Sequence, residues 1–433
     1  MHLSYKKFRS NKVKKILSII GIVTLCTVGV CAVPSIRNSL QPISNKLFNS
    51  SKIIFKSSNH SDESNIGLNL SWQVSNLDIQ INAKSAILVD ENSGQILFEK
   101  SPHEKLAIAS VTKIMTMLLI CESIDNNQIS LDDMVTCSEY ANSVKEAQIY
   151  LAVNEKMSVR DMLKGIAVVS GNDASIALAE KIALSEDAFV VKMNEKAKEL
   201  NMNNTNFANC TGLPNDNNYS SAYDVSLMSR ELMKHEVIKP FLKIWLDSLR
   251  DGKFMLANRN RLIRFYEGAT GIKTGSTEKA GFCLSASATR EGLSLISVVL
   301  GSESSDKRFE DSKKLLDHGF VNYAAIDELN CDEIVGRVKV KKGNIEELEV
   351  KIKDTKRPVI SKSKRNLVRK EIKLPAYVKA KIKQGDKIGE IIYKIDNTEI
   401  YRVDLVAVSD IKKISFGHAI SKTFKDWINI GRK

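Results

Sequence analysis

The chain has 433 residues, of which 43% are hydrophobic and 27% are charged. This composition is typical of a globular protein with room for two domains, and it excludes a disordered chain or a membrane protein with many spans. The formal net charge of +13 suits an anionic partner, such as a nucleic acid, an acidic membrane surface or an acidic wall polymer. Because no zinc-finger, basic-zipper or aromatic RNA-binding motif accompanies this charge, we expect no nucleic acid partner.

The beginning of the chain carries an export signal. Residues 1–15 contain six Lys or Arg and no acidic residue, and residues 16–33 are almost wholly apolar. A basic flank followed by such a run directs export across a membrane, with the basic side inside. The run is long for a signal-peptide core and just long enough for a spanning helix. A cleaved signal peptide and a retained membrane anchor over 1–33 both stay open, and in either case the rest of the chain lies outside the cytoplasm.

A linker and a mixed domain follow. Residues 34–79 are rich in Ser and Asn, which indicates a flexible linker. Residues 80–321 begin with a strand, a turn and a second strand over 85–98 and end with strands near 281–288 and 293–300. Between them lie helical patterns at roughly 110–122, 158–169, 173–183, 187–200 and 222–234. Strands, a block of helices and strands again predict one sheet covered by a helical cluster.

The last part of the chain changes character. Residues 322–413 are dominated by short alternating strands with turns at 342–344 and 384–386, which predicts a small all-β domain. In residues 414–433, apolar side chains recur at helical spacing and basic ones occupy the remaining face. This pattern is typical of an amphipathic helix lying in a membrane interface, and the alternative is a last helix docked on the protein body.

Seven cysteines are scattered along the chain and form no C-x-x-C pair. A secreted disulfide scaffold would be shorter and richer in cysteine. We therefore expect small buried hydrophobic residues at Cys26, Cys31, Cys121, Cys137, Cys210, Cys283 and Cys331.

Three short motifs could carry chemistry. Ser-x-x-Lys is common by chance, and it begins at Ser110 but also at Ser4, Ser276, Ser304, Ser361 and Ser409. Ser110 and Lys113 differ from the others because they open an apolar segment that predicts a buried helix, near whose start both side chains share one face. A serine needs a base to become a nucleophile, and a lysine can be that base only when burial or nearby charge lowers its pKa.

The other two motifs lie downstream. Ser170-Gly171-Asn172 offers a second hydroxyl for proton relay and a carboxamide for a substrate amide, although alone it would be a turn and a helix start. Lys273-Thr274-Gly275 offers a cation and a hydroxyl for a carboxylate, beside a glycine that permits close backbone approach. For each motif alone, a purely structural role is the better explanation. For the three motifs together, a catalytic role is the better explanation.

In this order and separation, the motifs resemble the Ser-x-x-Lys, Ser-x-Asn and Lys-Thr-Gly set of penicillin-binding proteins and serine β-lactamases. Over roughly residues 80–415 the sequence resembles, more specifically, the low-molecular-mass penicillin-binding proteins that are serine-type D-alanyl-D-alanine carboxypeptidases. The resemblance extends beyond the motifs to the surrounding sequence at 107–116, 168–180, 194–213, 219–232 and 271–288. One departure is Ile108, where many relatives carry proline, and it concerns loop shape and not chemistry.

The resemblance implies a fold and a partner set. The expected fold is an α+β penicillin-binding/β-lactamase-like domain, with an antiparallel sheet and a helical cluster, then a small all-β sandwich domain and a C-terminal amphipathic helix. The expected substrate is a peptidoglycan stem pentapeptide ending in D-Ala-D-Ala, with β-lactam antibiotics as covalent inhibitors and the membrane surface as a further partner. No cofactor and no metal are expected.

The resemblance also implies the role of each site residue. Ser110 attacks the carbonyl of the penultimate D-alanine, Lys113 accepts its proton, and Ser170 helps deliver a proton to the leaving D-alanine. The backbone N–H groups of Ser110 and Ser276 form the oxyanion hole. Arg259 lies upstream of the Lys-Thr-Gly motif and receives no role. The expected substrate-binding residues are Asn172, Lys273, Thr274, Gly275, Ser276 and Arg308.

Several alternatives stay open at this point. A class A β-lactamase would need a further glutamate for deacylation, and we interpret the spacing of Glu199 with Asn203 as coincidence. An endopeptidase that cuts D-alanyl cross-links and a non-catalytic wall-binding protein are the other two. A zinc carboxypeptidase is disfavoured because the chain has no H-E-x-x-H motif.

Overall fold

The structure is a computed structural model, and it describes residues 79–326, 333–353 and 359–414. The signal or anchor expected at 1–33 lies outside the described residues, and so do nearly all of the linker expected at 34–79 and of the tail expected at 414–433. Within the described ranges, no helix combines the length and the apolar character needed to cross a membrane.

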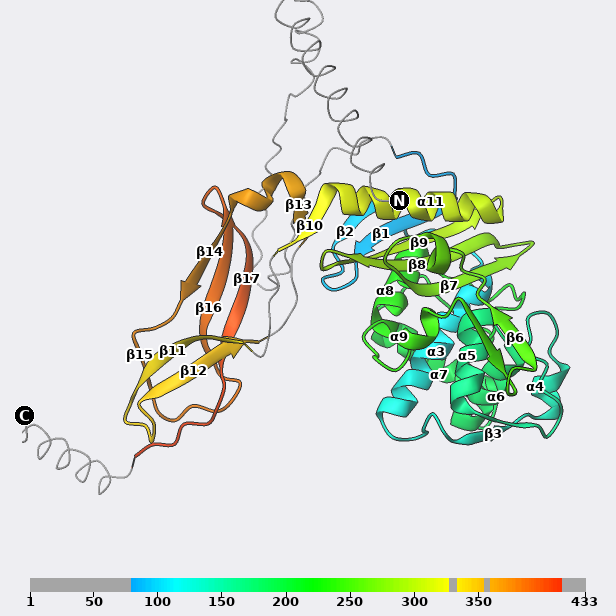
Figure 1. Ribbon diagram of the computed structural model, residues 1–433, viewed down its shortest axis with the longest axis horizontal. Helices are drawn as coiled ribbons and strands as arrows, with labels where there is room; N and C mark the ends of the chain where they lie inside the picture. The colour runs from blue at the N-terminus through cyan, green and yellow to red at the C-terminus, as the bar shows by residue number, and fades with distance from the viewer. Residues whose placement is uncertain (1–78, 327–332, 354–358, 415–433) are drawn as a thin grey trace, which may run out of the picture. The chain divides into compact units, whose positions relative to one another are not determined.

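The first domain is built on a five-stranded antiparallel sheet with the order β2-β1-β9-β8-β7 (Figure 1). Ile87 of β1 pairs with Val298 of β9, and Lys273 of β7 pairs with Ser285 of β8. Strand β7, which holds the Lys-Thr-Gly motif, is therefore an edge strand. The strands are β1 (Ser85–Asp90), β2 (Ile96–Lys100), β7 (Ala269–Thr277), β8 (Gly281–Arg290) and β9 (Leu293–Ser302).

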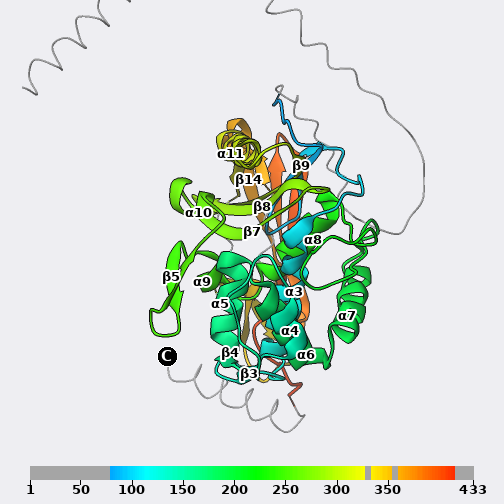
Figure 2. The ribbon, with the colours of Figure 1, turned by 90° about the vertical axis from the view of Figure 1, so that its right-hand side faces the viewer.

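The sheet has two apolar faces because successive side chains of a strand point to opposite sides. Ile87 and Val89 of β1 join a core shared with the helical cluster, whereas Ala86 and Leu88 join a second core. The second core is covered by the long helix α11, on the side of the sheet opposite to the other large helices (Figures 1 and 2). The helices are α3 (Lys113–Asp125), α4 (Glu139–Ser143), α5 (Val159–Val169), α6 (Asn172–Ala183), α7 (Glu186–Glu199), α8 (Ala222–Leu232), α9 (Lys239–Leu242), α10 (Leu262–Phe265) and α11 (Ser305–Asn322).

Helix α3 is the central helix of the cluster. It is apolar on every side, and Ile114, Met115 and Leu118 are fully buried, as the sequence predicts for this segment. Serine side chains cap the neighbouring helices: Ser158 accepts the N–H of Asp161 in α5, and Ser221 accepts that of Asp224 in α8. Two small two-stranded sheets complete the cluster, β3 (Met134–Thr136) with β4 (Lys156–Ser158) and β5 (Leu246–Leu249) with β6 (Phe254–Ala257).

The second domain is all-β, as expected. Instead of two separate facing sheets, its described strands are hydrogen-bonded into one six-stranded sheet with the order β14-β16-β17-β12-β11-β15, in which β11 and β15 are parallel. Leu348, Ile391 and Leu405 are fully buried in its own core. The strands are β11 (Ile334–Lys341), β12 (Glu347–Ile352), β14 (Val368–Lys373), β15 (Tyr377–Lys379), β16 (Lys387–Ile395) and β17 (Thr398–Ala407), and a further pair is formed by β10 (Tyr323–Ala325) and β13 (Val359–Ser361).

The cysteines of the described ranges fit the expectation of small buried residues. Cys121, Cys137, Cys210 and Cys283 are buried free thiols. Cys26, Cys31 and Cys331 lie outside the described residues.

Candidate active site

Ser110 lies on a tightly packed turn. It belongs to a short 3₁₀ helix, Ala109–Thr112, that leads directly into α3, and its side chain is partly exposed. A Cβ atom on Gly275 would lie 2.7 Å from the Ile108 carbonyl oxygen and 2.9 Å from the Ser110 nitrogen. These are backbone atoms, so only glycine lets β7 approach the serine turn this closely.

Lys113 is fully buried beside Ser110. Its Nζ lies 3.1 Å from Ser110 Oγ, and it donates to Asn172 Oδ1 at 2.7 Å and to the Thr211 carbonyl at 2.5 Å. Burial lowers the pKa of Lys113 to about 7, because the charged form loses its hydration. A neutral amine has two N–H donors and one lone pair. Since the two carbonyl oxygens can only accept, they take both donors and leave the lone pair facing the Ser110 hydroxyl.

Ser170 and Asn172 lie where α5 ends and α6 begins. Ser170 closes α5 in the left-handed conformation, with φ 69°, and its buried Oγ has no hydrogen-bond partner among the described residues. Asn172 is buried, and while its Oδ1 accepts from Lys113, its Nδ2 donates to the Lys145 carbonyl at 2.8 Å. The second motif is thus joined directly to the first.

The third motif lies inside β7. Lys273 and Thr274 are buried, and Ser276 is exposed near the end of the strand. Lys273 Nζ donates to the Thr274 carbonyl at 2.9 Å. Burial first, and then the positive charges of Lys113, Arg259 and Arg308, lower the pKa of Lys273 well below its usual range. An anionic ligand at this place would offset that repulsion and stabilise the ammonium.

Arg308 projects from α11 and is bound to the backbone of the sheet. Its Nη1 donates to the carbonyls of Gly275 at 3.0 Å and Cys283 at 3.3 Å, and its guanidinium lies over the rings of Phe282 and Phe309. The structure therefore places Arg308 against the motif strand, with contacts that fix the strand itself.

Arg259, which received no role in the sequence analysis, acts on the site through its charge. Its side chain is exposed, yet its charge lowers the pKa of both Lys113 and Lys273. The only sequence signal was a basic residue upstream of the Lys-Thr-Gly motif, which could not be told from other surface arginines.

The site contains groups that an acyl transfer requires: a serine with a buried lysine of lowered pKa beside it, and a second buried lysine, Lys273, on the neighbouring strand. The described residues contain no cluster of His, Cys, Asp and Glu that could hold a metal ion. Glu199, the residue considered for a β-lactamase role, is paired with Lys196 at 2.6 Å near the end of α7.

Comparison with known proteins identifies the family. Residues 72–304 match the model described as D-alanyl-D-alanine carboxypeptidase, and residues 329–413 match that of the C-terminal domain of penicillin-binding protein 5. The chain belongs to the D-alanyl-D-alanine carboxypeptidase family. As a member it is a serine hydrolase. The expected α+β domain followed by an all-β domain is confirmed, whereas the expected C-terminal amphipathic helix lies outside the described residues.

Individual relatives support the same family assignment. It is 43% identical to the D-alanyl-D-alanine carboxypeptidase DacF of Bacillus subtilis, over 80% of this chain and 90% of the relative. Penicillin binding protein 5 of Haemophilus influenzae aligns with a TM-score of 0.66 and 31% identity, over 77% of this chain and 99% of that structure. Penicillin-Binding Protein D2 of Listeria monocytogenes, solved in an ampicillin-bound form, covers 56% of this chain and 99% of its own, with a TM-score of 0.52 and 30% identity.

Proposed function

We propose that this carboxypeptidase removes the terminal D-alanine of peptidoglycan stem pentapeptides through an acyl-enzyme on Ser110. Ser110 Oγ attacks the carbonyl carbon of the penultimate D-alanine while its proton passes to Lys113. The peptide C–N bond then breaks, and Ser170 relays a proton to the departing amine. Water hydrolyses the ester and regenerates Ser110. The observation that carries this proposal is the buried Lys113 amine, whose pKa burial lowers to about 7, at 3.1 Å from Ser110 Oγ.

Substrate binding follows from the same geometry. Because β7 is an edge strand, one side of its backbone can pair with an extended peptide. Asn172 would contact the peptide amide, and Lys273 with Thr274 would hold the terminal carboxylate, which is an anion of the kind that would stabilise the Lys273 ammonium. The N–H groups of Ser110 and Ser276 would bind the oxyanion. The proposed occupancy by β-lactams is supported by the antibiotic-bound structures of the Listeria relative.

Mass spectrometry of the intact protein tests the nucleophile. Benzylpenicillin should add one covalent adduct to the wild type and none to Ser110→Ala. An adduct that persists in Ser110→Ala would overturn the assignment. A pentapeptide assay on the same samples should show D-alanine release by the wild type, whereas rapid penicillin turnover without D-alanine release would favour the β-lactamase alternative.

We also propose that the protein works at the outer face of the cell membrane. The basic and apolar start of the chain and the amphipathic pattern at 414–433 support this location. This location can be tested by fractionation of cells that express either the full chain or a version that ends at residue 413. The full chain should sediment with the membrane and need detergent for release, and recovery in the cytoplasmic fraction would contradict the proposal.

A further inference from the structure

A loop without helix or strand borders the active site. It runs from residue 144 to residue 155, between α4 and β4. Three non-glycine residues in it, Glu146, Tyr150 and Asn154, have φ values of 73°, 57° and 65°. Such left-handed conformations are unfavourable for L-residues and persist only where surrounding contacts hold them. The conformation of this loop therefore depends on the contacts that it makes with the rest of the domain.

The loop is bonded directly to Asn172. The Lys145 carbonyl accepts from Asn172 Nδ2 at 2.8 Å, and the Ala147 carbonyl accepts from the Asn172 backbone N–H at 2.7 Å. Asn172 Oδ1 in turn accepts from Lys113 Nζ. A displacement of the loop would thus turn the carboxamide that orients the catalytic base.

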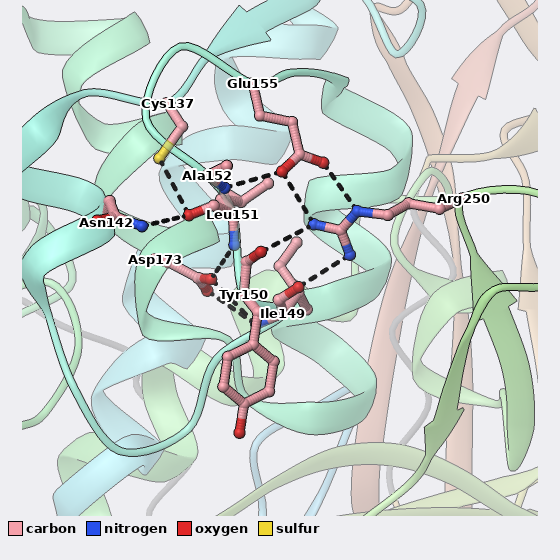
Figure 3. Close-up of polar contacts among 9 residues, drawn as sticks. All are labelled: Cys137, Asn142, Ile149, Tyr150, Leu151, Ala152, Glu155, Asp173 and Arg250. Carbon is pink, nitrogen blue, oxygen red and sulfur yellow. Dashed lines mark hydrogen bonds and ion pairs between the residues drawn. The ribbon is translucent and has the colours of Figure 1, made fainter.

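Asp173 holds the middle of the loop from the inside. Its fully buried carboxylate accepts the backbone N–H of Ile149 at 3.1 Å and that of Leu151 at 3.0 Å (Figure 3). Charge-assisted hydrogen bonds of this kind are about twice as strong as neutral ones. The N–H side of the segment is thereby fixed by the residue that directly follows Asn172.

Arg250 holds the same segment from the other side. It lies in the turn between β5 and β6, and its Nη1 and Nη2 donate to the carbonyls of Ile149 at 3.0 Å and Tyr150 at 3.1 Å (Figure 3). Its Nε and Nη2 also donate to the two carboxylate oxygens of Glu155, at 2.8 and 3.1 Å. One guanidinium thus joins the middle of the loop to its end, a geometry that the point charge of a lysine cannot reproduce.

We propose that Arg250 is a positioning residue of this active site. Through Glu155 and the carbonyls of Ile149 and Tyr150 it fixes the loop 144–155, so that the loop keeps Asn172 in the orientation that holds Lys113 beside Ser110. Arg250 itself touches none of the reacting atoms. The inference rests on the proposed acylation of Ser110 and adds a residue outside the three motifs to the machinery of that step.

The test separates the speed of acylation from the amount of folded enzyme. Wild type, Arg250→Ala and Arg250→Lys are titrated with fluorescent penicillin, which gives the labelled fraction and the second-order rate constant per labelled site. We expect Arg250→Ala to label near one site per chain but at least about tenfold more slowly, because small displacements of catalytic groups cost large factors in rate. Arg250→Lys should fall in between. The matched control is Arg160→Ala, whose arginine pairs with exposed Asp132 in the same domain and should react like the wild type.

Each result decides something. An Arg250→Ala protein with the wild-type rate constant would overturn the inference, whether its labelled fraction is full or reduced, because a purely structural role lowers only that fraction. Should Arg250→Ala not fold, Arg250→Lys and Glu155→Gln provide the same two readouts, and wild-type rate constants in both would overturn it. A wild type that is never labelled would instead contradict the proposed function.

Hydrogen exchange gives a readout without chemistry at Ser110. In the clamped loop the amides of Ile149 and Leu151 donate to Asp173 and should exchange slowly. We expect faster exchange over 144–155 in Arg250→Ala than in Arg160→Ala. Equal exchange in the two variants would show that Arg250 does not hold the loop.

Discussion

At the residue scale, the site depends on keeping an amine neutral inside the protein. Lys113 is surrounded by carbonyl oxygens that accept its two N–H groups, and burial removes the water that would stabilise its ammonium. Arg259 adds positive charge that disfavours the same protonated form. The protein therefore prepares a base at neutral pH from a side chain that is ordinarily an acid with a pKa of 10.5.

The first prediction concerns pH. The lowered pKa of Lys113, about 7, means that the free amine dominates above that pH and the ammonium below it. Acylation by penicillin should therefore rise about tenfold per pH unit below pH 7 and become level above it, since only the free amine can take the serine proton. Second-order labelling rates between pH 5 and 9, corrected for spontaneous penicillin hydrolysis, provide the measurement. A rate still rising at pH 9 would contradict the assigned base.

The second prediction concerns Gly275. In Gly275→Ala the new Cβ would meet backbone atoms of Ile108, Ser110 and Val111 at under 3 Å, so the serine turn or β7 must shift. We expect acylation to fall roughly a hundredfold, because a displacement of about 1 Å at the reacting groups has that effect. Gly336→Ala is the control, since its Cβ would meet only the flexible end of Leu374 at 2.9 Å and should leave labelling unchanged. Near-normal labelling of Gly275→Ala would show that the close approach is dispensable.

The sequence predicted these residues because their types and order are unusual together. Lys113 is hydrogen-bonded to both Ser110 and Asn172 in the structure, and Gly275 packs on the serine turn, although their catalytic roles stay predictions. The part played by Arg259 could not be found in this way, because a long-range charge effect depends on distance in space and leaves no local pattern. Arg250 was hidden because its hydrogen-bond partners Ile149, Tyr150 and Glu155 lie far from it in the sequence.

At the scale of elements, the site depends on α11, which packs on β8 and β9 and reaches β7 through Arg308. The buried guanidinium of Arg308 donates hydrogen bonds to the carbonyls of Gly275 and Cys283. The sequence did not single out α11, because charged residues interrupt its apolar face, on which Phe309, Leu316 and Phe320 are buried. The bounds of strand β7 were not predicted, since glycine and threonine in Lys-Thr-Gly equally indicate a turn.

The third prediction concerns this contact. Arg308→Ala leaves two buried carbonyls without their donor and should destabilise the protein by about 1–3 kcal/mol. It also removes a positive charge that lowers the pKa of Lys273, so that pKa should rise. Chemical denaturation and labelling rates provide the measurements. The control Arg160→Ala removes an exposed partner of Asp132 and should change stability by less than about 0.5 kcal/mol. Equal effects of the two substitutions would refute the role of Arg308.

At the scale of the whole molecule, the chemistry belongs to one domain. Every candidate site residue lies between Ser110 and Arg308, and the second domain has a separate core. The Listeria relative, whose own chain is 99% covered while it matches 56% of this one, shows that this fold exists in a shorter form. The division into two folded parts was predictable from the change in strand and helix patterning, but the pairing of β10 with β13 was not, because it joins strands far apart in sequence.

The fourth prediction tests this independence. A chain of residues 79–326 should be labelled by penicillin within about twofold of the wild-type rate, since no site residue is lost. It should melt a few degrees lower, because removal of β13 exposes Tyr323 and takes buried Val359 from the core under α11. Thermal melts and labelling rates of both chains give the answer. Loss of labelling in a folded fragment would mean that the second domain contributes to the site.

The buried hydroxyl of Ser170 has a consequence for inhibitor design. Its Oγ is buried and has no hydrogen-bond partner among the described residues. A compound that brings an acceptor to this oxygen would gain a hydrogen bond to a hydroxyl that is free of protein partners in the described part of the chain. Covalent inhibitors that differ only in whether they carry such an acceptor should therefore differ in residence time as well as in capture rate, and Ser170 is the place to look for selectivity over serine hydrolases that lack it.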